Sequence, residues 1–198
     1  GYGQPPSYRK DSPFKTPNLD RLAEQGMRFT DAHSAAANCT PTRYGVLTGR
    51  YPSRIGQFGV LKTYSKPIIP KSRLTVASFL KSQGYHTACI GKWHLGHKQK
   101  FLPTNHGFDT YFGIPYSNDM GRQKEDDVYP PLPLLRDEEV IQAQPDQRGI
   151  TERYVEESVR FVRENKEKPF FLYFAHMHVH LPHYPPARFV AESENGVY

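Results

Sequence analysis

Three short segments bring together residue types that can bind and cleave an anionic substrate. In the first, Cys39-Thr40-Pro41-Thr42-Arg43, a Cys precedes an expected helix start and an Arg follows one helical turn later. Unpaired backbone N–H groups at a helix N-terminus lower the pKa of a nearby thiol and favour a bound anion. The segment therefore predicts a reactive Cys39 beside the guanidinium of Arg43. A small buried Cys near a structural Arg is the simpler alternative.

The second segment is Gly91-Lys92-Trp93-His94-Leu95-Gly96. In an extended chain, Lys92 and His94 point to the same side. Lys92 supplies a point charge for an oxyanion and His94 can carry a proton, while the glycines let the backbone approach a neighbour closely. A turn with a solvated Lys and a hydrogen-bonded His is the alternative interpretation.

The third segment is rich in histidine: His176, His178, His180 and His183 follow an apolar run directly. If the strand continues, the first three lie on one side and could bind zinc or copper. An equal alternative is that one His acts while the others form hydrogen bonds. Because neither Cys nor carboxylate joins the group, we favour the rim of an active site over a metal cage.

Elements on either side of these segments must position them. Thr16-Pro17 predicts a helix start and Gly26 its end, and Met27–Thr30 reads as a short strand. We expect a helix beginning near Pro41, a second clear helix over Thr75–Gln83, and a strand over Tyr85–Ile90.

Loops, one helix and one strand are expected in the second half of the chain. We expect residues 97–150 to form long surface loops. Thr151 is the expected cap of a third helix that ends at Lys168-Pro169 and has an apolar stripe of Val155, Val159 and Val162. Phe170–Ala175 reads as a strand covered on both faces. Helices that alternate with strands predict an α/β fold with a largely parallel central sheet flanked by helices, whose chemistry lies beyond the carboxyl ends of the strands.

Composition excludes several classes of protein. The chain has 198 residues, of which 37% are hydrophobic and 13% aromatic, too many for a disordered chain. No apolar run approaches the roughly 20 residues that span a bilayer. Two Cys cannot build a disulfide scaffold. The formal charge is +6, but the basic residues are scattered, which argues against nucleic-acid binding.

Taken in order, the motifs resemble those of the type I sulfatases, which are formylglycine-dependent members of the alkaline phosphatase superfamily. Cys39-x-Pro41-x-Arg43, followed by Gly45-Val46-Leu47-Thr48-Gly49-Arg50, is similar to the first sulfatase signature, and residues 91–96 are similar to the second. His106-Gly107-Phe108-Asp109 and the Pro169–Tyr173 run before the His-rich segment also match. The arylsulfatase and N-acetylgalactosamine-6-sulfatase branch looks closest.

The resemblance implies a role for each matching residue. Cys39 would be oxidised to formylglycine (3-oxoalanine), whose hydrated aldehyde attacks sulfur with one hydroxyl and expels sulfate with the other. Arg43 would hold this group, Lys92 would contact sulfate oxygens, and His94 would orient a hydroxyl and assist elimination. His180, two residues before Pro182, matches the His that protonates the leaving oxygen, and Ser117 resembles a further substrate-binding residue. Thr42 departs mildly from the Ser usual at its position.

The resemblance also implies a divalent cation, calcium and sometimes magnesium. The family binds it through an Asp pair just before Gly-Tyr-Gly, an Asp-Asn pair further along, and the modified Cys. This chain opens on Gly1-Tyr2-Gly3, so of these ligands it carries only Cys39. We therefore expect residues 1–198 to be part of a sulfatase catalytic domain, lacking the first strand and the C-terminal part, and to be inactive alone.

The expected activity is hydrolysis of aryl or carbohydrate sulfate esters. Two alternatives stay open: a phosphonate or phosphate monoester hydrolase of the same superfamily, and a non-catalytic metal-binding module built on His176, His178 and His180. The resemblance implies a small-molecule or carbohydrate sulfate ester as partner, and a formylglycine-generating enzyme during maturation. It implies a periplasmic, secreted or lysosomal parent protein, whose signal peptide is not part of this sequence. No nucleic acid and no membrane span are expected.

Overall fold

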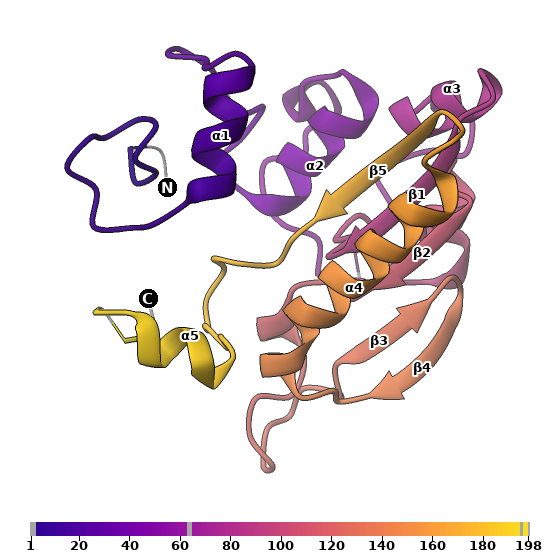
Figure 1. Ribbon diagram of the computed structural model, residues 1–198. Helices are drawn as coiled ribbons and strands as arrows, with labels where there is room; N and C mark the ends of the chain where they lie inside the picture. The colour runs from indigo at the N-terminus through magenta and orange to yellow at the C-terminus, as the bar shows by residue number, and fades with distance from the viewer. Residues whose placement is uncertain (1–2, 63–64, 195, 198) are drawn as a thin grey trace. The chain divides into compact units, whose positions relative to one another are not determined.

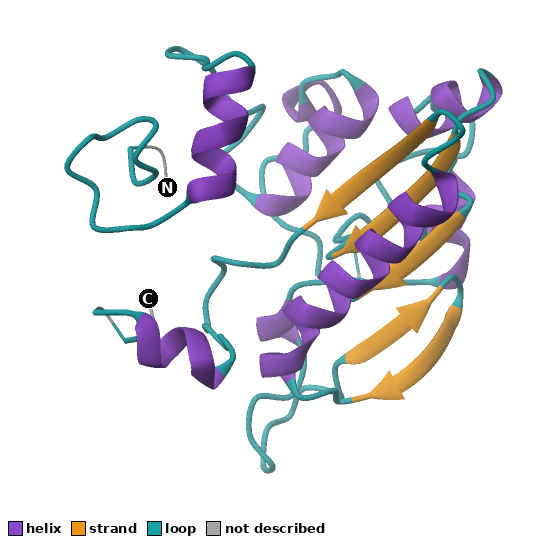
Figure 2. Cartoon of the chain, in the orientation of Figure 1, coloured by secondary structure: helices purple, strands orange, loops and turns teal. Residues whose placement is uncertain are grey.

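The computed structural model describes residues 3–62, 65–194 and 196–197, which fall into two compact units, 1–34 and 35–198. Figure 1 shows the elements along the chain, and Figure 2 distinguishes helices from strands. Within the described residues, no helix is long and apolar enough to cross a membrane.

The first unit contains helix α1 (Pro17–Gln25), which begins and ends as predicted, after Thr16 and at Gly26. The carboxylate of Asp20 accepts a hydrogen bond from the backbone N–H of Ser7 at 3.0 Å, and the Tyr8 hydroxyl donates to the Phe29 carbonyl at 3.1 Å. The expected strand over Met27–Thr30 is wrong, because these residues form no strand pairing. A strand is stabilised by its neighbour in a sheet, and the sequence pattern does not supply one.

The second unit is built on a sheet with the order β4-β3-β2-β1-β5. The parallel strands are β1 (His86–Gly91), β2 (Thr110–Gly113) and β5 (Phe170–Ala175), with β1 between the other two. Strands β3 (Pro133–Arg136) and β4 (Glu139–Ala143) extend the sheet as an antiparallel hairpin. The sheet is therefore mixed. Of its three parallel strands, the sequence predicted β1 and β5 but not β2.

The hairpin corrects the expectation that residues 97–150 form surface loops. This region also holds β2 and buried residues such as Leu132 and Leu134. The signal was weak because the strands are short and the turn is Asp137-Glu138, not the Asn-Gly or Asp-Gly typical of tight hairpins. Asp137 nevertheless adopts the left-handed conformation that such a turn needs, with φ of 54°.

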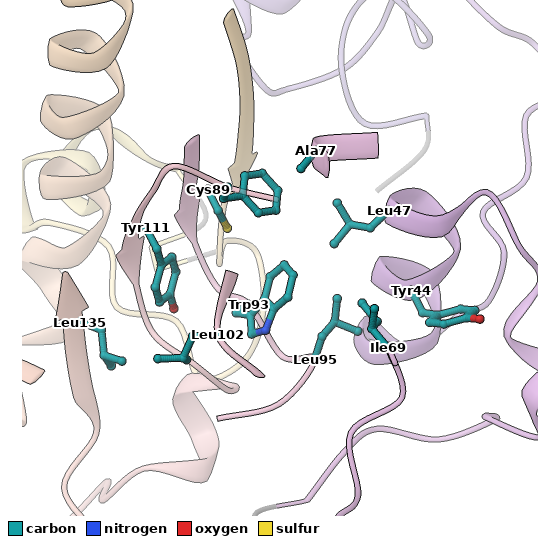
Figure 3. Packing of buried hydrophobic residues seen from close by; sticks show 11 residues of the cluster. Tyr44, Leu47, Ile69, Ala77, Cys89, Trp93, Leu95, Leu102, Tyr111 and Leu135 are labelled. Atoms are coloured by element: carbon teal, nitrogen blue, oxygen red, sulfur yellow. The ribbon is translucent and has the colours of Figure 1, made fainter. Parts of the chain in front are cut away.

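Helices cover both faces of the sheet. Helix α4 (Gln147–Asn165) packs on one face, where Ile150, Tyr154 and Phe161 meet residues of β1 and β2. On the other face, α2 (Cys39–Thr48) and α3 (Val76–Ser82) contribute to a second cluster. Figure 3 shows this second cluster, in which Leu47 and Ala77 lie opposite Cys89, Trp93 and Tyr111. Successive residues of a strand point to opposite faces, so β1 serves both cores.

The remaining elements are short. In the described part of the chain, the connections contain the 3-10 helices η1 (Pro52–Ile55), η2 (Gln99–Phe101), η3 (Pro103–His106) and η4 (Asn118–Met120), and helix α5 (Ala187–Glu192) follows β5. Helix α3 matches its prediction and has a capping box between Thr75 and Ser78. Helix α2 begins at Cys39, two residues before Pro41.

Two details of the third predicted helix were wrong. Helix α4 is capped by Asp146, whose side chain accepts a hydrogen bond from the Arg148 N–H at 3.0 Å, so Thr151 lies inside the helix. The stripe of Val155, Val159 and Val162 is exposed, because the helix turns its adjacent aromatic stripe toward the sheet. Large aromatic side chains bury more apolar area than Val does.

Strand β5 is also less covered than expected. It lies at the edge of the described sheet and pairs with β1. Most of its side chains are half-buried, and Phe174 is 40% exposed. A continuous apolar run did not distinguish an edge strand from a central one.

The two stripes of α4 give a stability prediction. Ile150→Ala should lower the free energy of unfolding by about 2–5 kcal/mol, since Ile150 is fully buried and its loss leaves a cavity. Val159→Ala is the matched control on the exposed stripe and should change it by less than about 1 kcal/mol. Urea denaturation measures both. Equal effects of the two variants would contradict the assigned orientation of α4.

Candidate active site

Cys39 is the first residue of helix α2, and its side chain is half-buried. Its Sγ lies 3.1 Å from Nδ1 of His94. The next residue, Thr40, holds this pair together: its hydroxyl donates to the His94 carbonyl at 2.9 Å and accepts from the Leu61 N–H at 3.1 Å. The predicted helix start and the second predicted segment therefore meet at the thiol.

His94 is buried and has a defined hydrogen-bonding state. Its Nε2 lies 3.1 Å from the Leu61 carbonyl, which can only accept, so Nε2 carries the hydrogen. Burial first, and then the charges of Lys92 and Arg43, lower the pKa of His94 to about 4. Near neutral pH the ring is uncharged, and the lone pair of Nδ1 faces Cys39.

Lys92 is almost completely buried, at 1% exposure. Its Nζ donates to the Ser117 hydroxyl at 2.8 Å. Burial lowers the pKa of Lys92, while the nearby Cys39 favours the charged form. The predicted site residues Lys92 and Ser117 are therefore in direct contact. Both Lys92 and His94 are directed toward Cys39, but the segment is not extended throughout, because His94 has a φ of 56°.

Backbone contacts hold that segment in place. The Lys92 N–H donates to the Ala175 carbonyl at 2.8 Å, and the His94 N–H donates to the Pro115 carbonyl at 3.1 Å. Gly91 permits the first contact: its φ is 119°, and a Cβ there would lie 2.1 Å from the Ala175 oxygen. No other residue type fits so close to a neighbouring backbone.

Arg43 lies beside the same segment and donates to the Lys92 carbonyl. It also contacts Tyr173 of β5, whose pKa is raised by burial in spite of the nearby guanidinium. Its Nε is buried and has no hydrogen-bond partner among the described residues. Two cationic side chains, those of Lys92 and Arg43, thus lie close to the neutral His94 that faces Cys39, an arrangement that favours an anion.

The His-rich segment is arranged differently from its prediction. Strand β5 ends at Ala175, so the histidines do not continue along one side of a strand. The His176 and His178 rings pack at 5.5 Å between centroids, and the His178 N–H donates to Nδ1 of His176 at 3.0 Å. His180 is exposed, with Nδ1 2.6 Å from the Leu181 carbonyl. Within the described ranges, no three metal-binding side chains gather at one point.

Sequence reasoning missed three contributors to this site. Leu61 acts through its backbone carbonyl, which leaves no trace in a side-chain pattern. Thr40 stands at a variable position of the Cys39-x-Pro41-x-Arg43 motif. Asn118 directly follows Ser117 and is 1% exposed. A polar residue next to a predicted site residue was the only available signal for Asn118.

This chain is similar to known proteins in both sequence and structure. The family model described as Sulfatase matches residues 6–198. Bovine arylsulfatase A is 38% identical over all of this chain and 43% of its own length, and rat N-acetylgalactosamine-6-sulfatase is 35% identical over 93% of the chain and 38% of its own length. The chain thus spans about two fifths of these relatives. The crystal structure of the PsFucS1 sulfatase from Pseudoalteromonas sp. aligns with a TM-score of 0.82 at 28% identity, covering 99% of this chain and 45% of that one.

These findings confirm the resemblance read from the motifs and the α/β fold that it implied. The branch named in the sequence analysis is also confirmed, because both an arylsulfatase and an N-acetylgalactosamine-6-sulfatase are among the similar proteins.

Buried His106, which stacks on Trp93 at 5.9 Å, gives a pH prediction. Burial lowers its pKa to about 4, whereas an unfolded His titrates near 6.5. The unfolded chain therefore binds the proton first, and stability falls as the pH drops from about 6.5 to 4. From pH 7 to 5 this one group should cost about 2 kcal/mol.

Urea denaturation at the two pH values tests this. His106→Gln should show a smaller loss of stability between pH 7 and 5 than the unmodified protein. His86→Gln, which replaces an exposed His at the start of β1, is the control and should leave the pH dependence unchanged. The same pH dependence in all three proteins would contradict the prediction.

Proposed function

Since this chain belongs to the sulfatase family, we propose that its protein hydrolyses sulfate esters of aryl or carbohydrate alcohols, using Cys39 converted to formylglycine. The observation that carries the proposal is the contact of 3.1 Å between the Cys39 Sγ and the unprotonated Nδ1 of His94, beside the buried cation of Lys92. The names of the similar proteins support both ester classes.

The Cys39 Sγ stands in for the oxygens of the modified side chain. When hydrated, formylglycine supplies two hydroxyl groups, one to attack sulfur and one to release sulfate without an attacking water. His94 Nδ1 accepts a hydrogen bond from one of these hydroxyls and takes its proton as sulfate leaves. The Leu61 carbonyl keeps Nε2 protonated, which leaves Nδ1 as the base.

Lys92 and Arg43 meet the negative charge of the sulfate group. Lys92 donates to its oxygens, while Ser117 holds the ammonium from the other side. Arg43 keeps the modified side chain and the Lys92 carbonyl in position. Preorganised donors in a site that excludes water stabilise a transferring sulfuryl group strongly.

His180 completes the assignment as the donor of a proton to the leaving oxygen. Its ring is exposed and therefore accessible to a substrate. The leaving group then departs as an alcohol or phenol, not as an anion.

A metal ion belongs to the sulfatase family, and we propose calcium, with magnesium as a possible substitute. Calcium takes six to eight oxygen ligands. The described residues offer no cluster that could hold it, so only Cys39, as formylglycine, is assigned here as a ligand. Every step above therefore rests on side chains of this chain.

The same proposal covers maturation and location. A formylglycine-generating enzyme would modify Cys39, and the parent protein would be periplasmic, secreted or lysosomal. Because the chain covers 43% of arylsulfatase A, we assign residues 1–198 to part of a catalytic domain. This part alone should not turn over sulfate esters.

Modification of Cys39 is the first test. Co-expression of the full-length protein with a formylglycine-generating enzyme should convert the thiol into an aldehyde. Mass spectrometry of the tryptic peptide that contains Cys39 measures the conversion, and Cys89, which is buried in the sheet, is the internal control that should stay a thiol. An unmodified Cys39 in every molecule would contradict the proposed nucleophile.

Removal of the buried cation is the second test. Lys92→Ala in the modified full-length protein should lower kcat for an aryl sulfate by about 10²–10³, the usual cost of losing one oxyanion donor. Lys168→Ala removes an exposed Lys and should leave kcat unchanged. Near-normal turnover by Lys92→Ala would remove this residue from the mechanism. If the modified protein without substitutions hydrolyses a phosphate ester faster than the aryl sulfate, a phosphatase is favoured instead.

A further inference from the structure

The side chain of Asn118 links two parts of the candidate site. It begins η4, directly after Ser117, the residue that accepts a hydrogen bond from Lys92. Its Nδ2 donates to Oε1 of Gln147 at 3.0 Å and to the carbonyl of Pro182 at 3.3 Å. Gln147 is the first residue of α4, and Pro182 stands two residues after His180.

Asn118 is buried among these partners, at 1% exposure, and its amide orientation is fixed by them. Both partners are oxygen atoms that can only accept, so the NH₂ group must face them. Its Oδ1 is buried and has no partner among the described atoms. Rotating the amide by 180° would place this oxygen next to Oε1 of Gln147 and the carbonyl oxygen of Pro182. An Asp at this position would bring a buried negative charge to two acceptor oxygens.

The residues on either side of His180 are exposed. Val179 is 69% exposed and Leu181 is 67% exposed. Gln123 supplies a second attachment: its Nε2 donates to the Asn118 carbonyl at 2.7 Å, and its Oε1 accepts from the Tyr184 hydroxyl at 2.9 Å. Residues 118–123 therefore hold the segment at Pro182 and at Tyr184, just beyond His180.

We propose that Asn118 is a positioning residue that keeps His180 in register with the Lys92–Ser117 pair through its hydrogen bond to the Pro182 carbonyl. The inference rests on the proposed function, in which Lys92 binds the sulfate and His180 protonates the leaving oxygen. One amide next to Ser117 thus couples the sulfate-binding cation to the proton donor. A displacement of about 1 Å in such a group can cost on the order of 10²-fold in rate.

Leaving-group dependence separates this role from a purely structural one. An alkyl sulfate has a poor leaving group and needs the proton, whereas 4-nitrophenyl sulfate releases a stable anion and needs it much less. Asn118→Ala in the full-length, modified protein should lower kcat for the alkyl ester by about 10–100-fold and for the aryl ester by less than about 3-fold. His180→Ala should show the same selectivity more strongly.

Gln147→Ala is the matched control, because it removes the other hydrogen bond of the same amide and leaves the bond to Pro182. It should leave the ratio of the two kcat values unchanged. Tyr184→Phe removes the hydrogen bond to Gln123 without leaving a buried cavity. It should change the ratio of the two kcat values in the same direction as Asn118→Ala does. This variant keeps the test decisive if Asn118→Ala does not fold. Thermal unfolding of every variant reports stability separately.

The possible results are distinct. If the full-length protein with formylglycine at position 39 and no substitution hydrolyses neither ester, the proposed function fails, and the inference fails with it. If it hydrolyses both and Asn118→Ala slows both equally, the proposed function stands and the positioning role is overturned. The positioning role of Asn118 is likewise overturned if Gln147→Ala changes the ratio of the two kcat values as much as Asn118→Ala does. If Asn118→Ala does not fold, an unchanged ratio in Tyr184→Phe overturns it.

Discussion

The buried ammonium group of Lys92 is the constraint on which the rest of the site depends. A charge that is 1% exposed has lost its water and needs polar partners in the protein. It donates to the neutral hydroxyl of Ser117 and lies near Cys39, and Arg43 adds a second cation beside it. Asp119 offsets part of this positive charge. The pair of cations favours a bound anion. It also keeps His94 neutral, because the two cations add to the effect of burial on its pKa.

The sheet makes this burial possible. Lys92 follows β1, which lies between β2 and β5, so both neighbouring strands contribute to the surroundings of its side chain. The carbonyls of Ala175 and Pro115 fix the backbone of residues 92–94 on its two sides. Glycine at position 113 allows the same close approach from β2, because a Cβ there would lie 1.8 Å from the Gly91 oxygen. The carboxyl ends of parallel strands, where open α/β sheets place their chemistry, thus converge on Cys39.

Helix α4 connects the core to the site at its first turn. Its aromatic stripe packs on the sheet, while its first residue, Gln147, accepts the hydrogen bond from Asn118. A side chain next to Ser117 thereby contacts the same helix that covers the hydrophobic core. The segment after β5 has few buried groups of its own, so its position depends on polar contacts such as the one at Pro182. Asn118 therefore joins the densely packed core to the segment after β5.

The sequence by itself determined the chemistry of the site: the types and order of Cys39, Arg43, Lys92 and His94, and the α/β pattern that brings them together. It also located α1, α3 and β1 closely, because caps and apolar periodicity are local signals. Only the tertiary structure decided which stripe of α4 is buried, that β3 and β4 form a hairpin, and that β5 lies at an edge. It alone placed the Leu61 carbonyl on His94 and Asn118 on Pro182. Those outcomes depend on contacts between residues far apart in the chain, and a backbone carbonyl or a single buried amide carries no periodic signal that a sequence could display.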